Sequence, residues 1–162
     1  MRKALFVAAL CAASLAFAAS AAAANHTTVT ETNTIHGTFT EPEFSQNPCS
    51  GAAITSFQAY GNIVEHETYF LENGQVTEVW ATFTETGKVA ITDANGVSYD
   101  GHFTVWGNYN LNEQNTNETF TVTIRVSGSD GSTIVAREVE HFGTNANGEV
   151  TASFDKMSLT CG

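Results

Sequence analysis

The stretch Asn47-Pro48-Cys49-Ser50-Gly51 contains one of the two cysteines of a disulfide bond that we expect to hold this chain together. Cys49 has one plausible partner, Cys161, because the third cysteine, Cys11, lies in a segment that we expect to be removed. An exported chain meets oxidising conditions, so the sequence predicts a disulfide between Cys49 and Cys161. The two positions are 161 − 49 = 112 apart. Closing a loop of that order is worth about 4.7 kcal/mol in the chain-entropy model.

Residues 1–24 have the pattern of an export signal. Two basic residues precede an apolar run over 4–13, and three alanines before Asn25 offer the small side chains that a signal peptidase requires. The run is too short to span a bilayer, and no later stretch reaches the roughly 20 apolar residues of a transmembrane helix. We therefore predict a signal peptide over 1–24 and a secreted, extracellular mature protein. A lipoprotein anchored through Cys11 is the alternative. A lipid-attachment site requires a small residue before the cysteine, so the bulky Leu10 disfavours this alternative.

The mature chain is strongly acidic. Removal of Arg2 and Lys3 leaves four of the six basic residues against all 17 acidic residues, a net charge of 4 − 17 = −13. A surface of this charge repels phosphate backbones and anionic membranes. We therefore predict no nucleic-acid partner and no membrane span, and we expect the charge to keep the protein soluble outside the cell.

Strand patterns and turn signals alternate along the rest of the chain. Residues 120–126 place four apolar side chains on one face and polar side chains on the other. Asn-Gly and related pairs mark hairpin turns, as in Glu72-Asn73-Gly74-Gln75. We expect interruptions at Gly61 and at Thr86-Gly87, and a long polar loop over 110–117. The predicted strands are 27–40, 54–60, 62–71, 76–84, 88–92, 97–109, 120–126, 133–142 and 150–159.

Short connections imply that neighbouring strands are antiparallel. Neighbours that follow one another in the chain favour an up-and-down meander over a Greek key, which needs a long crossover. About eight strands close into a small barrel, and closure hides the sheet edges. We therefore predict a single all-β domain over 25–162, built as one antiparallel up-and-down barrel of about eight strands. A two-sheet β-sandwich is the alternative.

This layout resembles small secreted bacterial β-barrel proteins of lipocalin-like or allene-oxide-cyclase-like shape. The resemblance is carried by the export signal, a Thr-rich first strand, the stretch 47–51, Gly-punctuated hairpins and the late Cys161. The Gly-x-Trp sequence that lipocalins carry near the first strand is absent, so no residue role is transferred from the family. The resemblance implies a barrel that holds a small apolar molecule.

Histidines and carboxylates are the first candidates for chemistry. Glu65 and Glu67 flank His66, but alternation along a strand turns them to the opposite face, and we interpret them as part of a solvated acidic face. Four histidines fall on different predicted strands without the local spacing of a chelate, at His36, His66, His102 and His141. We predict no catalytic residue, no metal and no cofactor.

Two further patterns have simple interpretations. Arg125 lies on the polar face of its strand, and we expect it to meet Glu138 or Glu140 across a hairpin, in a surface ion pair worth about 0–1 kcal/mol. The segments 93–96 and 145–148 carry Asp and Asn in a spacing that faintly suggests calcium loops. Both segments stand where hairpin turns are required, so turn chemistry explains them and we expect no calcium.

The two tryptophans are the most informative aromatic residues. Trp80 and Trp106 fall on the less apolar side of their strands, so both faces of these strands carry apolar side chains. Tryptophan suits interfaces, because its ring is apolar and its N–H needs a partner. One account is an interior cavity on one face and an oligomer contact on the other. In the second account the N-terminal segment or the long loop covers the second face.

The composition and the expected barrel favour three functions. The first is a secreted, non-enzymatic β-barrel that binds a small, mostly apolar ligand. The second is an extracellular structural or protein-interaction domain with a packed interior, which could form a homo-oligomer through its second apolar face. The third is a cyclase- or isomerase-type enzyme, based on fold analogy. The predicted ligand-binding residues are Tyr60, His66, Trp80, His102 and Trp106.

Overall fold

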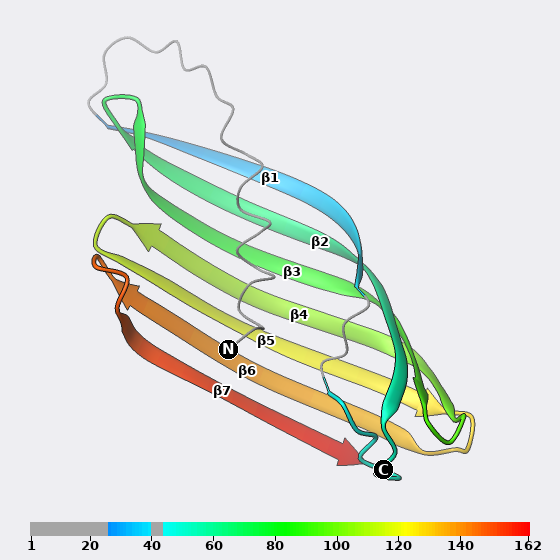
Figure 1. Ribbon diagram of the computed structural model, residues 1–162. Coiled ribbons are helices and arrows are strands. Elements are labelled where there is room, and N and C mark those ends of the chain that lie inside the picture. Colours follow the sequence, from blue (N-terminus) through cyan, green and yellow to red (C-terminus); the bar gives the residue numbers. More distant parts are fainter. Residues whose placement is uncertain (1–25, 40–43) are drawn as a thin grey trace.

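The computed structural model describes residues 26–39 and 44–162, which form one curved antiparallel sheet (Figure 1). The predicted export signal lies outside the described residues. Among the described residues no helix has the length and apolarity needed to cross a membrane. The seven strands are β1 (His26–Phe39), β2 (Ile54–Glu72), β3 (Gln75–Asp93), β4 (Ser98–Asn112), β5 (Asn115–Gly128), β6 (Thr133–Asn145) and β7 (Val150–Cys161).

The predicted all-β, up-and-down organisation is confirmed. Each strand pairs with the next in the chain, so the order across the sheet is β1-β2-β3-β4-β5-β6-β7. The edges are β1 and β7, and no pairing between them joins the described residues. The sheet is therefore open, and closure into a barrel is not confirmed. All seven described strands belong to this one sheet, so the alternative of two packed sheets is not what the structure shows.

The predicted interruptions at Gly61 and at Thr86-Gly87 are wrong, because β2 and β3 run straight through them. Gly61 and Gly87 lie directly opposite each other. A Cβ atom at Gly61 would stand 2.7 Å from Cζ of Phe103, and one at Gly87 would stand 2.5 Å from Cε1 of the same ring. The glycines make room for a ring from a third strand, as glycine within a strand often does.

The predicted long loop over 110–117 is also wrong. Strand β4 continues to Asn112 and β5 begins at Asn115, so two residues connect them. The Asn112 side chain closes this turn, since its Oδ1 accepts hydrogen bonds from the N–H groups of Gln114 (2.8 Å) and Asn115 (2.9 Å). The polar residues that suggested a loop are the ends of two paired strands. The predicted strands 54–60 and 62–71 are both part of β2, and 76–84 and 88–92 are both part of β3, so the sheet has seven strands.

Alternation along the strands gives the sheet two faces. We call the face that carries Phe57, Ile91 and Ile124 the inner face, because these side chains are buried. We call the opposite face, which carries Tyr60 and Trp106, the outer face, because these side chains are exposed. The apolar core occupies one end of the inner face. Its buried members are Phe44, Phe57, Ala59, Val89, Ile91, Tyr99, Phe103, Val122, Ile124, Val126, Ile134 and Ala136.

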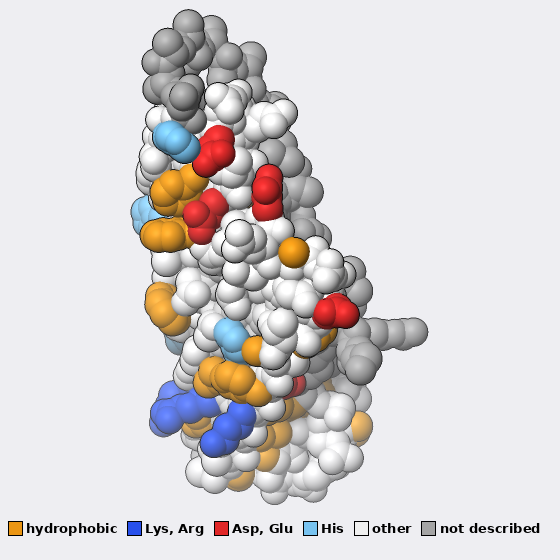
Figure 2. Space-filling model, turned by 90° about the vertical axis from the view of Figure 1, so that its left-hand side faces the viewer, with side chains coloured by type: hydrophobic (Ala, Val, Ile, Leu, Met, Phe, Trp, Pro, Cys, Tyr) orange, Lys and Arg blue, Asp and Glu red, His pale blue; other side chains and the backbone are white. Residues whose placement is uncertain are grey.

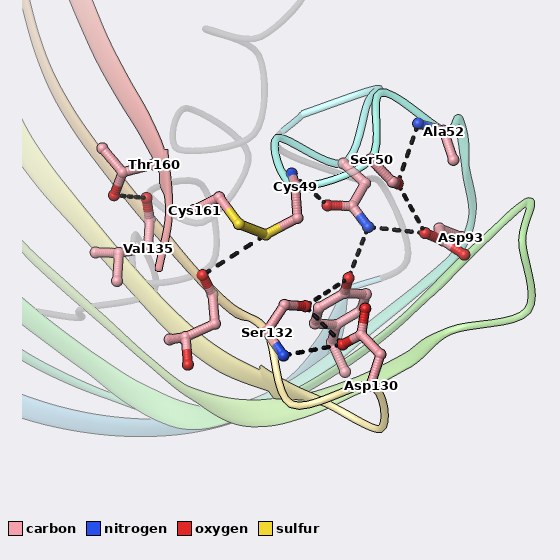
Figure 3. The surroundings of a disulfide bond; sticks show 12 residues. Cys49, Ser50, Ala52, Asp93, Asp130, Ser132, Val135, Thr160 and Cys161 are labelled. Carbon is pink, nitrogen blue, oxygen red and sulfur yellow. Dashed lines mark hydrogen bonds between the residues drawn. A yellow bond between two sulfur atoms is a disulfide. The ribbon is translucent and has the colours of Figure 1, made fainter.

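The predicted disulfide between Cys49 and Cys161 is confirmed (Figure 3). Residues 44–53 fold against the end of the sheet where β7 finishes (Figure 1). Phe44 is buried there and contributes to the core. The bond therefore joins the segment that precedes β2 to the last residue of an edge strand.

Asn47 fixes this segment from within. Its side chain is 0 % exposed, and its Nδ2 donates to Oδ2 of Asp93 and to the hydroxyl of Tyr99, both at 2.7 Å. Its Oδ1 accepts the N–H of Cys49 at 2.8 Å. Burial alone would raise the pKa of Asp93, but the donors Asn47, Val97 and the turn backbone outweigh it and hold that pKa below its ordinary value. The cysteine is thus positioned by a fully bonded polar residue.

Candidate functional site

All five predicted ligand-binding residues lie on the outer face. Tyr60 and His66 lie on β2, Trp80 on β3, and His102 and Trp106 on β4. Tyr60, Trp80 and Trp106 are 57 %, 53 % and 51 % exposed. The predicted long loop does not cover this face, because it is part of two strands. The structure therefore presents the five residues on an open surface.

Tyr60 and His102 are brought together at one end of this face. Lys88 lies directly opposite both of them, one strand from each. They border an open groove with a volume of about 610 Å³. The groove is lined by Thr38, Gln58, Ala59, Tyr60, Lys88, Val89, Ala90, Asp100, Gly101 and His102. His66, Trp80 and Trp106 lie outside it, toward the other end of the sheet.

Trp80 is exposed but held in place. Its Nε1 donates to Oε1 of Glu78 at 2.6 Å, and its ring packs edge-on against Phe70 with centroids 5.1 Å apart. Asn110 donates to the same Oε1 at 2.9 Å, and Asn112 in turn donates to Asn110 at 3.2 Å. Hydrogen bonds from Asn110 and Trp80 lower the pKa of Glu78, so the acceptor stays charged. About half of the Trp80 side chain is thus exposed to solvent while two contacts hold the ring in place.

The exposed aromatic rings are spaced along the face. Thr84, which pairs with Trp106, is four positions along β3 from Trp80. A rise of about 3.3 Å per residue and a strand spacing of about 4.8 Å place the two indoles about 14 Å apart. Lys88 lies a further four positions along β3, beside Tyr60. Trp80, Trp106 and Tyr60 therefore mark a track that runs along the strands.

Threonine and asparagine side chains fill the surface between the rings. Trp106 stands between Thr84 and Thr121, its partners on the two neighbouring strands. Trp80 stands between Thr68 and Asn110 in the same way. Each ring is thus flanked by groups that donate and accept hydrogen bonds. The Nδ1 atom of His66 is 2.9 Å from the hydroxyl of Thr32, which fixes that imidazole beside the track.

The lysine and arginine side chains of the described residues also lie on the outer face. They are Lys88, Arg125, Arg137 and Lys156. The predicted contact of Arg125 with Glu138 or Glu140 is wrong. Arg125 pairs with Val135, and alternation along β6 turns the two glutamates to the inner face. In the view of Figure 2, Lys and Arg side chains lie together at one end of the molecule, next to hydrophobic side chains and a histidine.

The interpretation of Glu65 and Glu67 as a solvated acidic face is wrong. These inner-face side chains are 8 % and 3 % exposed. Glu67 accepts hydrogen bonds from the hydroxyls of Tyr69 (2.7 Å) and Tyr109 (2.6 Å), and from Asn33 at 3.3 Å. Burial and the charge of Glu67 raise the pKa of Glu65, although a hydrogen bond from Tyr109 opposes the rise. The curvature of the sheet, which a single strand does not reveal, encloses these groups.

A second group of carboxylates lies on the inner face of β5, β6 and β7. Oxygens of Glu138, Glu140 and Asp155 come within 4.8 Å of one another. Burial and the charge of Glu140 raise the pKa of neighbouring Glu118. Oε1 of Glu118 is buried and has no hydrogen-bond partner among the described residues. Charge repulsion of this kind lowers stability at neutral pH.

Sequence reasoning missed two parts of the outer face. It did not find the partners that hold Trp80, of which Glu78 lies only two residues away and was detectable from the alternation. It also missed the alignment of Lys88 with Arg125, which depends on the register of three strands. Comparison with family models, curated proteins and solved structures found no match to this chain.

Proposed function

We propose that the protein acts outside the cell as a non-enzymatic binding protein that takes a polysaccharide chain along the outer face of its sheet. One observation carries this proposal. Three large aromatic side chains, Tyr60, Trp80 and Trp106, each stand more than half exposed on one face of a continuous sheet. Aromatic rings are enriched at surfaces that a ligand or partner covers.

The chemistry of the surface matches a sugar. A sugar ring has apolar C–H faces and hydroxyl groups around its edge. The indole of Trp80 offers a flat apolar surface, and neighbouring Thr68 and Asn110 offer donors and acceptors. Covering about 100 Å² of ring is worth about 2.5 kcal/mol. Several rings along one track favour a chain of sugars over a single one.

The rigidity of the surface supports the same proposal. Trp80 is oriented by Glu78 and Phe70 before any ligand arrives. Binding to a fixed ring loses less side-chain entropy than binding to a mobile one. The position of all five predicted residues on an open face also favours an extended ligand over the enclosed small apolar molecule expected from the sequence. A small apolar molecule held in a closed barrel is the alternative proposal, and it would occupy the inner face.

Substitution of the rings tests this function. We expect Trp80→Ala and Trp106→Ala each to weaken binding by about 2 kcal/mol, or roughly 30-fold in Kd, because each removes a stacking surface. The measurement is affinity electrophoresis through gels that contain one soluble polysaccharide each. Leu111→Ala is the matched control, since Leu111 is 47 % exposed at the same end of the sheet but lies on the inner face.

Several outcomes would contradict the proposal. Failure of the wild-type protein to be slowed by any polysaccharide would do so, and so would equal slowing of Trp80→Ala and wild type. A small apolar molecule that co-purifies equally with wild type and Trp80→Ala, detected by native mass spectrometry, would assign the function to the inner face. A protein that binds no glycan and sediments as a dimer would favour the interaction-domain alternative.

A further inference from the structure

We infer that the polysaccharide is acidic, with carboxylate groups that the cations of the outer face recognise. This inference rests on the proposed function and names the class of its ligand. Lys88, Arg125 and Arg137 carry it. All three are exposed, and all three lie at the end of the track that Tyr60 marks.

The three cations are close together. Lys88 is opposite His102, which is opposite Arg125, so two strand spacings place the charges about 10 Å apart. Arg137 follows Val135, the partner of Arg125, by two positions on the same face. A diagonal neighbour of this kind lies about 7–8 Å away. Like charges at these distances repel one another, so this arrangement is more favourable when an anion lies among them.

The described carboxylates form no ion pair within 4.0 Å with these cations. The ion pair found within 4.0 Å among the described residues joins His26 and Glu72, far from this cluster. Asp100, the nearest acidic residue on the outer face, is a diagonal neighbour of both Lys88 and Arg125, about 7–8 Å away. It lies within the groove but pairs with neither Lys88 nor Arg125. The cluster is thus available to a ligand.

The net charge of the protein does not oppose this inference, because the two faces of the sheet differ in charge. The buried carboxylates lie on the inner face, behind the sheet: Glu65, Glu67, Glu85, Asp93 and Glu138. A ligand on the outer face therefore meets the cations at closer range than it meets these carboxylates.

Rings and cations together favour an acidic polysaccharide over other polyanions. Tyr60 lies beside Lys88, and Trp106 lies four positions along β4 from His102, so one extended chain would contact both the rings with its C–H faces and the cations with its carboxylates. A nucleic acid would also place phosphates among these cations, so DNA is the competing polyanion in the test. A membrane surface would require cations over a wider area than three side chains supply.

The test uses one polymer backbone with and without charge. The exported, oxidised protein is run through gels that contain polygalacturonate or its fully methyl-esterified form. We expect wild type to bind polygalacturonate about tenfold more tightly, because three exposed charge pairs contribute a fraction of a kcal/mol each. We expect the triple variant Lys88→Gln, Arg125→Gln, Arg137→Gln to lose this preference and to keep its affinity for the ester. Added salt should also remove the preference.

A matched control separates local from net charge. Gln46→Glu, Ala146→Glu and Asn147→Asp together lower the net charge by the same amount at exposed positions away from the cluster. This control should keep the preference. Equal binding of both polymers by wild type would overturn the inference and leave the proposed function standing, whereas binding of neither, nor of any other glycan, would overturn the function itself. Tighter binding of DNA or of phosphatidylserine vesicles, lost in the triple variant, would overturn the polysaccharide as ligand.

Discussion

Single residues decide how charge is distributed through this sheet. Glu118 and Glu65 are carboxylic acids whose pKa values are raised, first by burial and then by a neighbouring carboxylate. Glu78 and Asp93 accept hydrogen bonds from nearby donors, and their pKa values are lowered. Residues of one type therefore have opposite effects on the pH dependence of stability.

The raised pKa of Glu118 predicts how stability depends on pH. A carboxyl whose folded-state pKa lies above its unfolded value of 4.5 stabilises the fold fully below pH 4.5, and this contribution is lost as pH rises through the folded pKa. We expect Glu118→Gln to raise the free energy of unfolding at pH 7 by on the order of 1 kcal/mol, with little change at pH 4. Urea unfolding at both values measures it. Exposed Glu113→Gln is the control, and equal gains at pH 4 and pH 7 would contradict the explanation.

At the scale of the element, most strands were predictable and their continuity was not. Alternation and Asn-Gly turns predicted strands and hairpins, because both signals lie within a few neighbouring residues. The role of Gly61 depends instead on its partner Gly87 and on the ring of Phe103, which comes from another strand. No local pattern contains those contacts, so the sequence predicts an interruption where the glycine packs under a ring.

The candidate site was predictable to the same extent. Alternation placed Trp80 and Trp106 on the less apolar side of their strands, and the structure shows both rings exposed there. The row that joins Lys88 to Arg125 was not predictable, because a shift of one residue in register would turn one of them to the inner face. The burial of Glu67 depends on the curvature of the whole sheet. Local sequence thus predicts faces, whereas register and curvature decide neighbours.

The glycine pair predicts two effects of different kinds. A methyl group at Gly61 would meet two side chains, the ring of Phe103 and Oε1 of Glu85. One at Gly87 would meet the ring of Phe103 and also the carbonyl oxygen of Tyr60. We expect each alanine variant to lose at least about 1–3 kcal/mol of stability. Phe103→Leu should partly restore Gly61→Ala, because a side chain can move, and should restore Gly87→Ala less, because the backbone cannot. Thr86→Ala, exposed on the other face, is the control in chemical denaturation.

That experiment has a clear contrary outcome. Equal stability of wild type and Gly87→Ala would show that the strands are not packed under the Phe103 ring. Equal rescue of both alanine variants by Phe103→Leu would show that the ring alone, and not the Tyr60 carbonyl, limits the space.

At the scale of the whole molecule, the disulfide joins the segment before β2 to the end of β7. We expect the double variant Cys49→Ser, Cys161→Ser to lose about 2–5 kcal/mol of stability, because its unfolded chain is free of a long covalent loop. The double variant should still fold, since Asn47 keeps its bonds to Asp93 and Tyr99. Guanidinium unfolding of both proteins, with and without reductant, measures the change. Wild type that unfolds at the same guanidinium concentration in either condition would contradict it.

The same bond decides how the molecule responds to force. Six strands, β2 to β7, lie inside the covalent loop that Cys49 and Cys161 close, and β1 lies outside it. A load applied to the chain on either side of the loop passes through the sulfur atoms and bypasses those six strands. Under tension only the edge strand β1 would separate from β2. The aromatic rings and cations of β2 to β6 would keep their positions. A protein built in this way keeps the shape of its outer face while the chain is pulled.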